Sequence, residues 1–136
     1  MFFSLFLAKG SWTSCGRWKY ILTQQLKSWE GAKIHCQQIQ TKGTKTWLAA
    51  PKTQEEQYCH RKFSQGLTWI GVHRSNTSFL FRYLDGAKFD YNVWRNEDLN
   101  TNGSCLAILG KNQTFWTTEN CSRPLKFVCQ IGKLCL

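Results

Sequence analysis

Seven cysteines in a chain of 136 residues are the feature that most limits what this sequence can fold into. Cysteines at this density are typical of small domains in oxidising compartments, where disulfides supplement a modest hydrophobic core. The chain is 42% hydrophobic and 15% aromatic, which is enough for one core of ordinary size and too much for a disordered tail. We therefore expect one compact, disulfide-braced domain that is secreted or extracellular.

The amino-terminal end is expected to stand apart from this domain. Residues 1–8 form an apolar run with no basic region before it, which is typical of a weak or truncated signal segment. We take residues 1–14 as this segment and residues 15–136 as a single domain. No apolar run approaches the roughly 18–20 residues that a membrane-spanning helix needs, so no membrane span is expected in this chain.

The formal net charge of +10 comes from 18 Lys and Arg against 8 Asp and Glu. This balance favours anionic partners such as nucleic acid, sulfated glycans or membrane surfaces. The basic residues are dispersed, however, and only Arg61 and Lys62 are adjacent. The lack of basic runs argues against nucleic acid, and it leaves either an anionic glycan partner or a solvated basic face.

Two short helices are predicted in the first half of the chain. Ser28 can cap a helix whose apolar residues recur at spacings of three and four and end in Cys36. Thr53 and Glu56 match a capping box, which predicts a second helix that ends before Gly66.

From residue 67 the hydrophobic period changes to two, which predicts short strands. We expect strands at residues 68–72, 79–83, 105–109, 114–116 and 126–129. The span 88–104 between them is polar and has little apolar material, so it predicts a long loop. Long loops on a rigid scaffold are where binding sites concentrate.

A set of short motifs occurs in a fixed order along the chain: Trp29-Glu30-Gly31-Ala32 running to Cys36, Glu55-Glu56, Trp69-Ile70-Gly71, Asp85-Gly86, Phe89-Asp90-Tyr91, Trp94, Cys105, Trp116, Cys121 and Phe127-Val128-Cys129. This is the order found in C-type lectin-like domains, and the chain resembles that family from about Cys15 to Gln130. The resemblance implies an α+β fold with two helices packed on small antiparallel sheets and a long polar loop. It also implies that the domain is a recognition module.

The resemblance implies two disulfides, Cys36 to Cys129 and Cys105 to Cys121. Long-form members carry a further amino-terminal pair about ten residues apart, and Cys15 has no such neighbour, which puts the amino-terminal hairpin of those members in doubt. Because the termini of the family meet, the preferred partner of Cys15 is Cys135. Cys59 is then left over, either as a buried thiol or as a bridge to a second chain in a disulfide dimer.

Sugar-binding members hold one calcium ion in the long loop. Its ligands are a Glu-Pro-Asn or Gln-Pro-Asp tripeptide four residues after a Trp, a Glu just before the next Cys, and an Asn-Asp pair after another Trp. Counting from Trp94, this chain has Asp98-Leu99-Asn100 at the tripeptide, nearer the mannose-type pattern. Asp98 and Asn100 are therefore the metal ligands if there are any. Leu99 replaces the proline, and a cis bond before a non-proline residue costs about 2.5–4 kcal/mol.

The other calcium ligands of the family are missing. Gly103 stands where the Glu is expected, and Thr117-Thr118 replace the Asn-Asp pair. Calcium takes roughly six to eight oxygens and favours several carboxylates. Losing three of the five protein ligands should remove high affinity, so no cofactor is expected and Ca²⁺ has weak support.

Oxygen-bearing side chains in and beside the long loop form the candidate ligand site, namely Asn96, Glu97, Asp98, Asn100, Asn102, Thr117 and Glu119. Three Asn residues could also carry glycans because each begins an N-x-S/T sequon: Asn76, Asn102 and Asn112.

The interpretation that fits best is a recognition module for a cell-surface or secreted protein, or for a glycan, without the usual calcium site. The alternative is a calcium-dependent, mannose-type lectin that uses Asp98 and Asn100. A small secreted hydrolase is a remote third possibility, with Glu30 and Glu119 as its only candidate carboxylates. No enzyme activity is expected, and the three histidines show no metal-ligand spacing.

Overall fold

The chain folds as two ten-residue helices on a mostly antiparallel sheet, in a computed structural model that describes residues 12–39, 43–64, 66–75, 78, 80–90, 95–96, 103–110 and 114–133. In chain order the elements are β1 (Thr13–Cys15), β2 (Trp18–Leu22), α1 (Trp29–Gln38), β3 (Thr44–Leu48), α2 (Gln54–Phe63), β4 (Leu67–His73), β5 (Arg82–Tyr83), β6 (Arg95–Asn96), β7 (Cys105–Gly110), β8 (Thr114–Glu119) and β9 (Lys126–Lys133).

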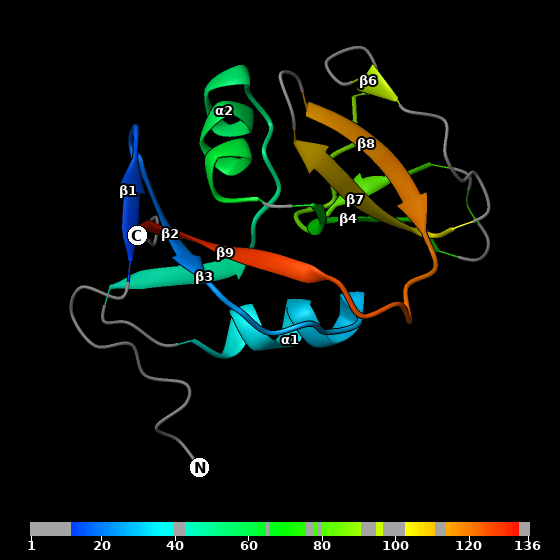
Figure 1. Ribbon diagram of the computed structural model, residues 1–136, viewed down its shortest axis with the longest axis horizontal. Helices are drawn as coiled ribbons and strands as arrows, with labels where there is room; N and C mark the ends of the chain where they lie inside the picture. The colour runs from blue at the N-terminus through cyan, green and yellow to red at the C-terminus, as the bar shows by residue number, and fades with distance from the viewer. Residues whose placement is uncertain are drawn as a thin grey trace.

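Strand β9 holds the two ends of the sheet together (Figure 1). Its second half lies between β2 and β3, and its first residues pair with β4 in parallel. The sheet then continues through β7 and β8 to the short strand β6, which pairs with β8 in parallel. The prediction of antiparallel sheets therefore holds for most of the ladder, with these two parallel pairings as the exceptions.

Helix α1 begins where the sequence predicts. The Ser28 hydroxyl accepts a hydrogen bond from the Gly31 backbone N–H at 3.1 Å, which satisfies one of the free donors of the first turn. Trp29, Ala32 and Cys36 are buried against the sheet. The helix lies along one side of β3 and β9 in Figure 1.

Helix α2 begins at the predicted capping box. The Thr53 hydroxyl accepts from the Glu56 backbone N–H at 3.1 Å, and the helix ends at Phe63, before Gly66. Its buried face carries Glu56, Cys59 and His60.

The core has three parts, and two of them lie on opposite faces of β4, which is buried on both sides. Trp69 packs with α1 on one face, whereas Ile70 and Val72 pack with β7 and β8 on the other. A third, smaller cluster joins α2 to the amino-terminal hairpin through Tyr20 and Cys59. Burial on both faces explains why β4 reads as a nearly continuous apolar run.

The strands differ from the prediction mainly at their ends and at the amino terminus. The strand expected at residues 79–83 is reduced to β5, while β8 and β9 extend beyond their predicted ends to Glu119 and Lys133. The amino-terminal hairpin that the cysteine spacing put in doubt does form, as β1 and β2.

Three disulfides brace the domain, and two of them are the pairs that the resemblance implies. Cys36 is bonded to Cys129, which ties α1 to β9, and Cys105 is bonded to Cys121 at the end of the β7–β8 pair.

The third disulfide corrects the expected pairing of Cys15 with Cys135. Cys15 is bonded to Cys59, with their Cα atoms 5.7 Å apart, so Cys59 is not available as a bridge to a second chain. The hairpin turns at Gly16, which has a positive φ of 59°, and a Cβ at this position would lie 2.4 Å from a Glu55 carboxylate oxygen. This close approach sets β1 against α2. Cys135 lies outside the described residues.

Neither described helix is long and apolar enough to cross a bilayer.

Candidate functional site

The predicted site lies at one end of the sheet, where β6 runs beside β8. We call this surface the loop face; it consists of β6, β8, Gly103 and residues 119–123. The pairings Arg95 to Phe115 and Asn96 to Trp116 bring the backbone of the long loop alongside β8. The side chain of Asn96 is outside the described part of the structure.

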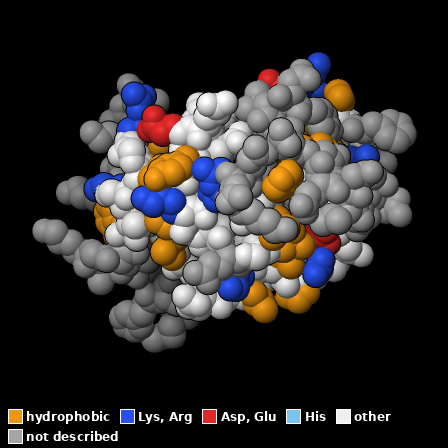
Figure 2. Space-filling model, turned by 45° about the horizontal axis from the view of Figure 1, so that its top comes forward, with side chains coloured by type: hydrophobic (Ala, Val, Ile, Leu, Met, Phe, Trp, Pro, Cys, Tyr) orange, Lys and Arg blue, Asp and Glu red, His pale blue; other side chains and the backbone are white. Residues whose placement is uncertain are grey.

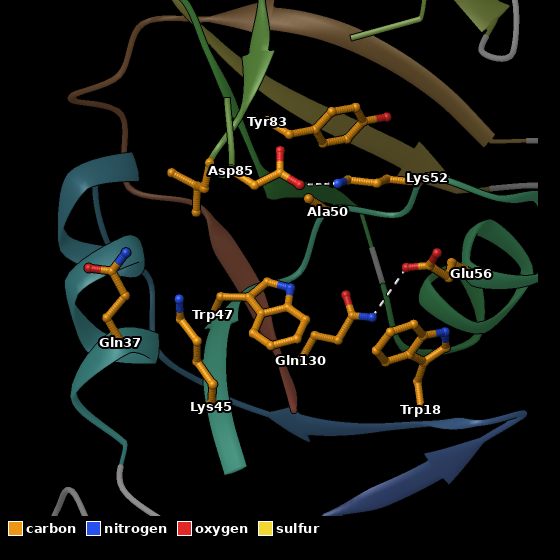
Figure 3. Close-up of a pocket in the computed structure, with 11 residues that line it drawn as sticks. Trp18, Gln37, Lys45, Trp47, Ala50, Lys52, Glu56, Tyr83, Asp85 and Gln130 are labelled. Carbon is orange, nitrogen blue, oxygen red and sulfur yellow. Dashed lines mark hydrogen bonds and ion pairs between the residues drawn. The ribbon is translucent and has the colours of Figure 1, made fainter. Parts of the chain in front are cut away.

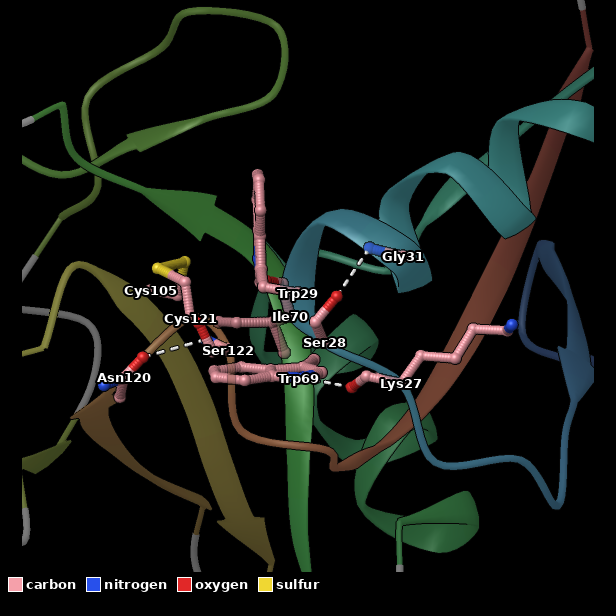
Figure 4. Close-up of a disulfide and its surroundings, with 10 residues drawn as sticks. All are labelled: Lys27, Ser28, Trp29, Gly31, Trp69, Ile70, Cys105, Asn120, Cys121 and Ser122. Atoms are coloured by element: carbon pink, nitrogen blue, oxygen red, sulfur yellow. Dashed lines mark hydrogen bonds between the residues drawn. A yellow bond between two sulfur atoms is a disulfide. The ribbon is translucent and has the colours of Figure 1, made fainter.

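The far end of the loop face is held rigidly by the Cys105–Cys121 disulfide (Figure 4). The Cys121 carbonyl accepts a hydrogen bond from the Trp29 backbone N–H at 2.9 Å, so the disulfide is anchored to the start of α1. The Asn120 side-chain oxygen accepts from the Ser122 N–H at 2.9 Å, which fixes the turn after β8. The loop face therefore rests on a braced support.

Gly103 is a glycine because two segments of backbone meet there. A Cβ on this residue would lie 2.3–2.4 Å from the backbone N, C and O atoms of Glu119, closer than real side chains come. The position at which the sugar-binding members carry a calcium-ligating Glu therefore has no room for a side chain.

Glu119 is also unsuited to holding a cation, because Arg123 already neutralises it. An Arg123 Nη1 donates to Glu119 Oε1 at 2.7 Å, and the carboxylate side chain is only 9% exposed. A charge-assisted bond of this length with a partly buried carboxylate is among the stronger kinds of ion pair. Arg123 was not among the predicted site residues, because a spacing of four brings side chains together in a helix, whereas here the turn after β8 does so.

The two threonines that replace the Asn-Asp pair point away from solvent. Thr117 and Thr118 are 2% and 5% exposed, and the Thr117 hydroxyl is within 3.4 Å of the Thr118 carbonyl, to which it donates. Short, buried hydroxyls at these positions serve the packing of β8 and contribute no carboxylate to the face.

Several predicted residues lie outside the described part of the chain, namely Glu97, Asp98, Asn100 and Asn102 of the ligand site and the sequon residues Asn76 and Asn112. Their roles remain predictions. Of the predicted ligand set, the structure brings together Thr117, Glu119 and the backbone of Asn96.

The candidate residues for metal binding or hydrolysis are separated from one another. His35 contacts the ring of Phe127, His60 is enclosed in the core, and His73 stacks on Trp29 at 4.5 Å. Burial lowers the pKa of each, with a further contribution from Lys27 at His35 and from Lys33 at His73. Within the described ranges, no three His, Cys, Asp or Glu side chains cluster as a metal site requires. Glu30, the other candidate carboxylate, pairs with Lys33 at 2.8 Å on α1.

The charge on the described surface is dispersed, as the sequence indicated. Figure 2 shows Lys and Arg side chains spread over the described part of one face, some of them beside Asp or Glu, and not gathered in one patch. A partner bound through charge would therefore meet separate cations.

Comparison with known proteins gives consistent results for sequence and fold. The family model described as "Lectin C-type domain" matches residues 25–131. Snaclec rhodocetin subunit delta from Calloselasma rhodostoma is 28% identical over 124 residues, which cover 88% of this chain and 94% of that protein.

Two solved structures share the fold at lower identity. The C-type lectin CEL-I from Cucumaria echinata has a TM-score of 0.78 at 17% identity, covering 93% of this chain and 99% of the other. A calcium-independent type II antifreeze protein has a TM-score of 0.72 at 18% identity, covering 93% and 95%. The region that the family model matches, residues 25–131, includes both implied disulfides and all of the loop face.

Proposed function

This chain belongs to the C-type lectin domain family, and we propose on that premise that it is an extracellular recognition module whose loop face binds a protein or glycan without the family's calcium site. The observation that carries the proposal is the contact of Gly103 with the Glu119 backbone, which leaves no space for the missing acidic ligand. The Arg123–Glu119 ion pair and the two buried threonines support it.

The extracellular location and the partner class rest on separate support. Three disulfides are typical of proteins that fold in oxidising compartments. Two relatives are named as subunits of snaclecs, which favours a protein as partner. The proposal assigns no catalysis, because Glu30 and Glu119 each pair with a different cation on a different element.

The test is a calorimetric titration of calcium into chelator-stripped, oxidised protein, followed by thermal melts with and without the ion. We expect no binding heat and no change in melting temperature at millimolar calcium. Calcium needs roughly six to eight oxygen ligands, and Gly103, Thr117 and Thr118 replace three of those that the family supplies. Binding at or below millimolar concentration with a raised melting temperature would overturn the proposal. The same titration on Asp98→Asn and Asn100→Ala variants would then establish the calcium-dependent alternative.

The ligand is sought with arrays of glycans and of secreted and cell-surface proteins, each read in calcium and in chelator. We expect the same binding in both buffers. Binding that disappears in chelator would contradict the calcium-independent mode.

A further inference from the structure

A second concave site lies away from the loop face, between the β3–β9 pair and the turn after β5 (Figure 3). It has a volume of about 360 Å³, which is within the range of pockets that hold small ligands. None of its lining residues belongs to the loop face. In Figure 1, β3 and β8 lie toward opposite ends of the domain.

Two tryptophans form the apolar wall of this pocket. Trp18 on β2 and Trp47 on β3 are both half-buried and meet edge to face, with ring centroids 6.4 Å apart. Gly132 on β9 makes this arrangement possible, because a Cβ there would lie 2.5 Å from the Trp47 ring. The indoles therefore offer flat apolar surface in a fixed position.

The buried polar part of the pocket consists of Glu56 and Gln130. Their side chains are joined by a hydrogen bond from Gln130 Nε2 to Glu56 Oε2 at 3.2 Å, although they lie 74 residues apart in the chain. Both residues are more than nine-tenths buried. Figure 3 shows the carboxamide oxygen of Gln130 pointing toward the pocket. Together with the lone pairs left on the carboxylate, it presents acceptors that suit hydroxyl donors.

The rim of the pocket carries one cation that is not neutralised within the described residues. Lys52 pairs with Asp85 and lies 4.9 Å from the centre of the Tyr83 ring. Lys45, exposed on β3 beside Trp47, forms no ion pair with another described residue. Glu56 is negative too, so the lining as a whole is neutral, and a negative group is favoured only at the outer rim, beside Lys45 and away from Glu56.

We propose that this pocket binds one sugar ring carrying a carboxylate or sulfate. The apolar face of the ring packs on Trp47, its hydroxyls donate to Glu56 and Gln130, and its anionic group meets Lys45. A purely aromatic ligand fits less well, because it would bury the carboxylate and the carboxamide oxygen without giving them donors. The site is independent of the function proposed for the loop face.

The test follows the indole N–H signals of Trp18 and Trp47 by NMR during titration with glucuronate, glucose 6-sulfate, glucose and inorganic sulfate. Trp18→Phe and Trp47→Phe variants assign the two signals. All titrations contain chelator, so a calcium site at the loop face cannot contribute, and the result does not depend on the calcium experiment.

We expect saturable shifts of both signals with the two acidic sugars and weaker binding of glucose and of sulfate alone. Lys45→Gln should weaken the acidic sugars about fivefold, the size of one exposed ion pair, and leave glucose unchanged. Lys19→Gln, an equal charge change at an exposed residue that does not line the pocket, should have no effect.

Three results would overturn the proposal. They are the absence of saturable shifts with every sugar, equal losses in the two lysine variants, and binding of inorganic sulfate as tight as that of glucose 6-sulfate. Binding of only one of the two acidic sugars would support the site and identify its anionic group.

Discussion

At the scale of single residues, His60 couples the stability of the domain to pH. The ring is completely buried, and burial lowers its pKa to about 4. Its Nδ1 lies 2.6 Å from the Ser64 hydroxyl, which also lies 2.8 Å from the His60 carbonyl oxygen. Nε2 has no hydrogen-bond partner among the residues that the structure describes. In the doubly protonated ring, Nε2–H would therefore be a buried donor without an acceptor among those residues.

This arrangement predicts a loss of stability on acidification. The folded pKa lies below the value of about 6.5 in the unfolded chain, so the unfolded state binds more protons between the two. The neutral His60 ring makes its full contribution to the free energy of unfolding above about pH 6.5. That contribution falls by about 1.4 kcal/mol per pH unit down to about pH 4. Urea unfolding measured between about pH 4 and 6.5 should show a smaller change of unfolding free energy with pH in His60→Gln than in the unsubstituted protein. In His35→Gln the reduction should be smaller, because His35 is only partly buried. An unchanged slope in His60→Gln would refute the assignment.

At the scale of elements, the Cys15–Cys59 bond predicts how the amino-terminal hairpin is held. Peptide mapping without reduction should recover Cys15 linked to Cys59, and a Cys15–Cys135 peptide would contradict the structure. The bond closes 44 residues, so a double Cys15→Ser, Cys59→Ser variant should lose about 2–4 kcal/mol in urea unfolding. Gly16→Ala, which keeps the bond and strains the same turn, serves as the comparison.

The helices could be predicted from sequence because their signals are local. Ser28 and Thr53 each act on a backbone N–H three residues away, and the structure has both caps. The partner of Cys15 could not be predicted in this way, because it depends on where β1 packs. Cys59 and Phe63 are four residues apart and therefore share one face of α2, and in the structure both pack in the cluster that joins α2 to the hairpin.

At the scale of the whole molecule, the sequence showed which residues depart from the family pattern but not why they do. Comparing the positions around Trp94, Cys105 and Trp116 with the family's motifs identified Gly103 and Thr117 as departures from the family pattern. The reason that Gly103 has no side chain is a contact with Glu119, sixteen residues away, and only the fold shows it. The second pocket was hidden more completely, because Glu56 and Gln130 meet only when α2 packs beside β9.

The dispersed positive charge predicts that added salt stabilises the domain. Eight acidic residues cannot balance 18 basic ones, so repulsion remains even though pairs such as Lys33–Glu30 and Arg123–Glu119 form. Salt screens both the repulsion among the cations and the attraction within the ion pairs. Because the repulsion is the larger of the two here, its loss stabilises the folded domain. Between low and physiological sodium chloride, the melting temperature should rise by about 3–5 °C, or about 1 kcal/mol for this size. An Arg17→Gln, Lys19→Gln variant, which removes two exposed charges, should respond less. A melting temperature that falls with salt would mean that ion pairs outweigh the repulsion.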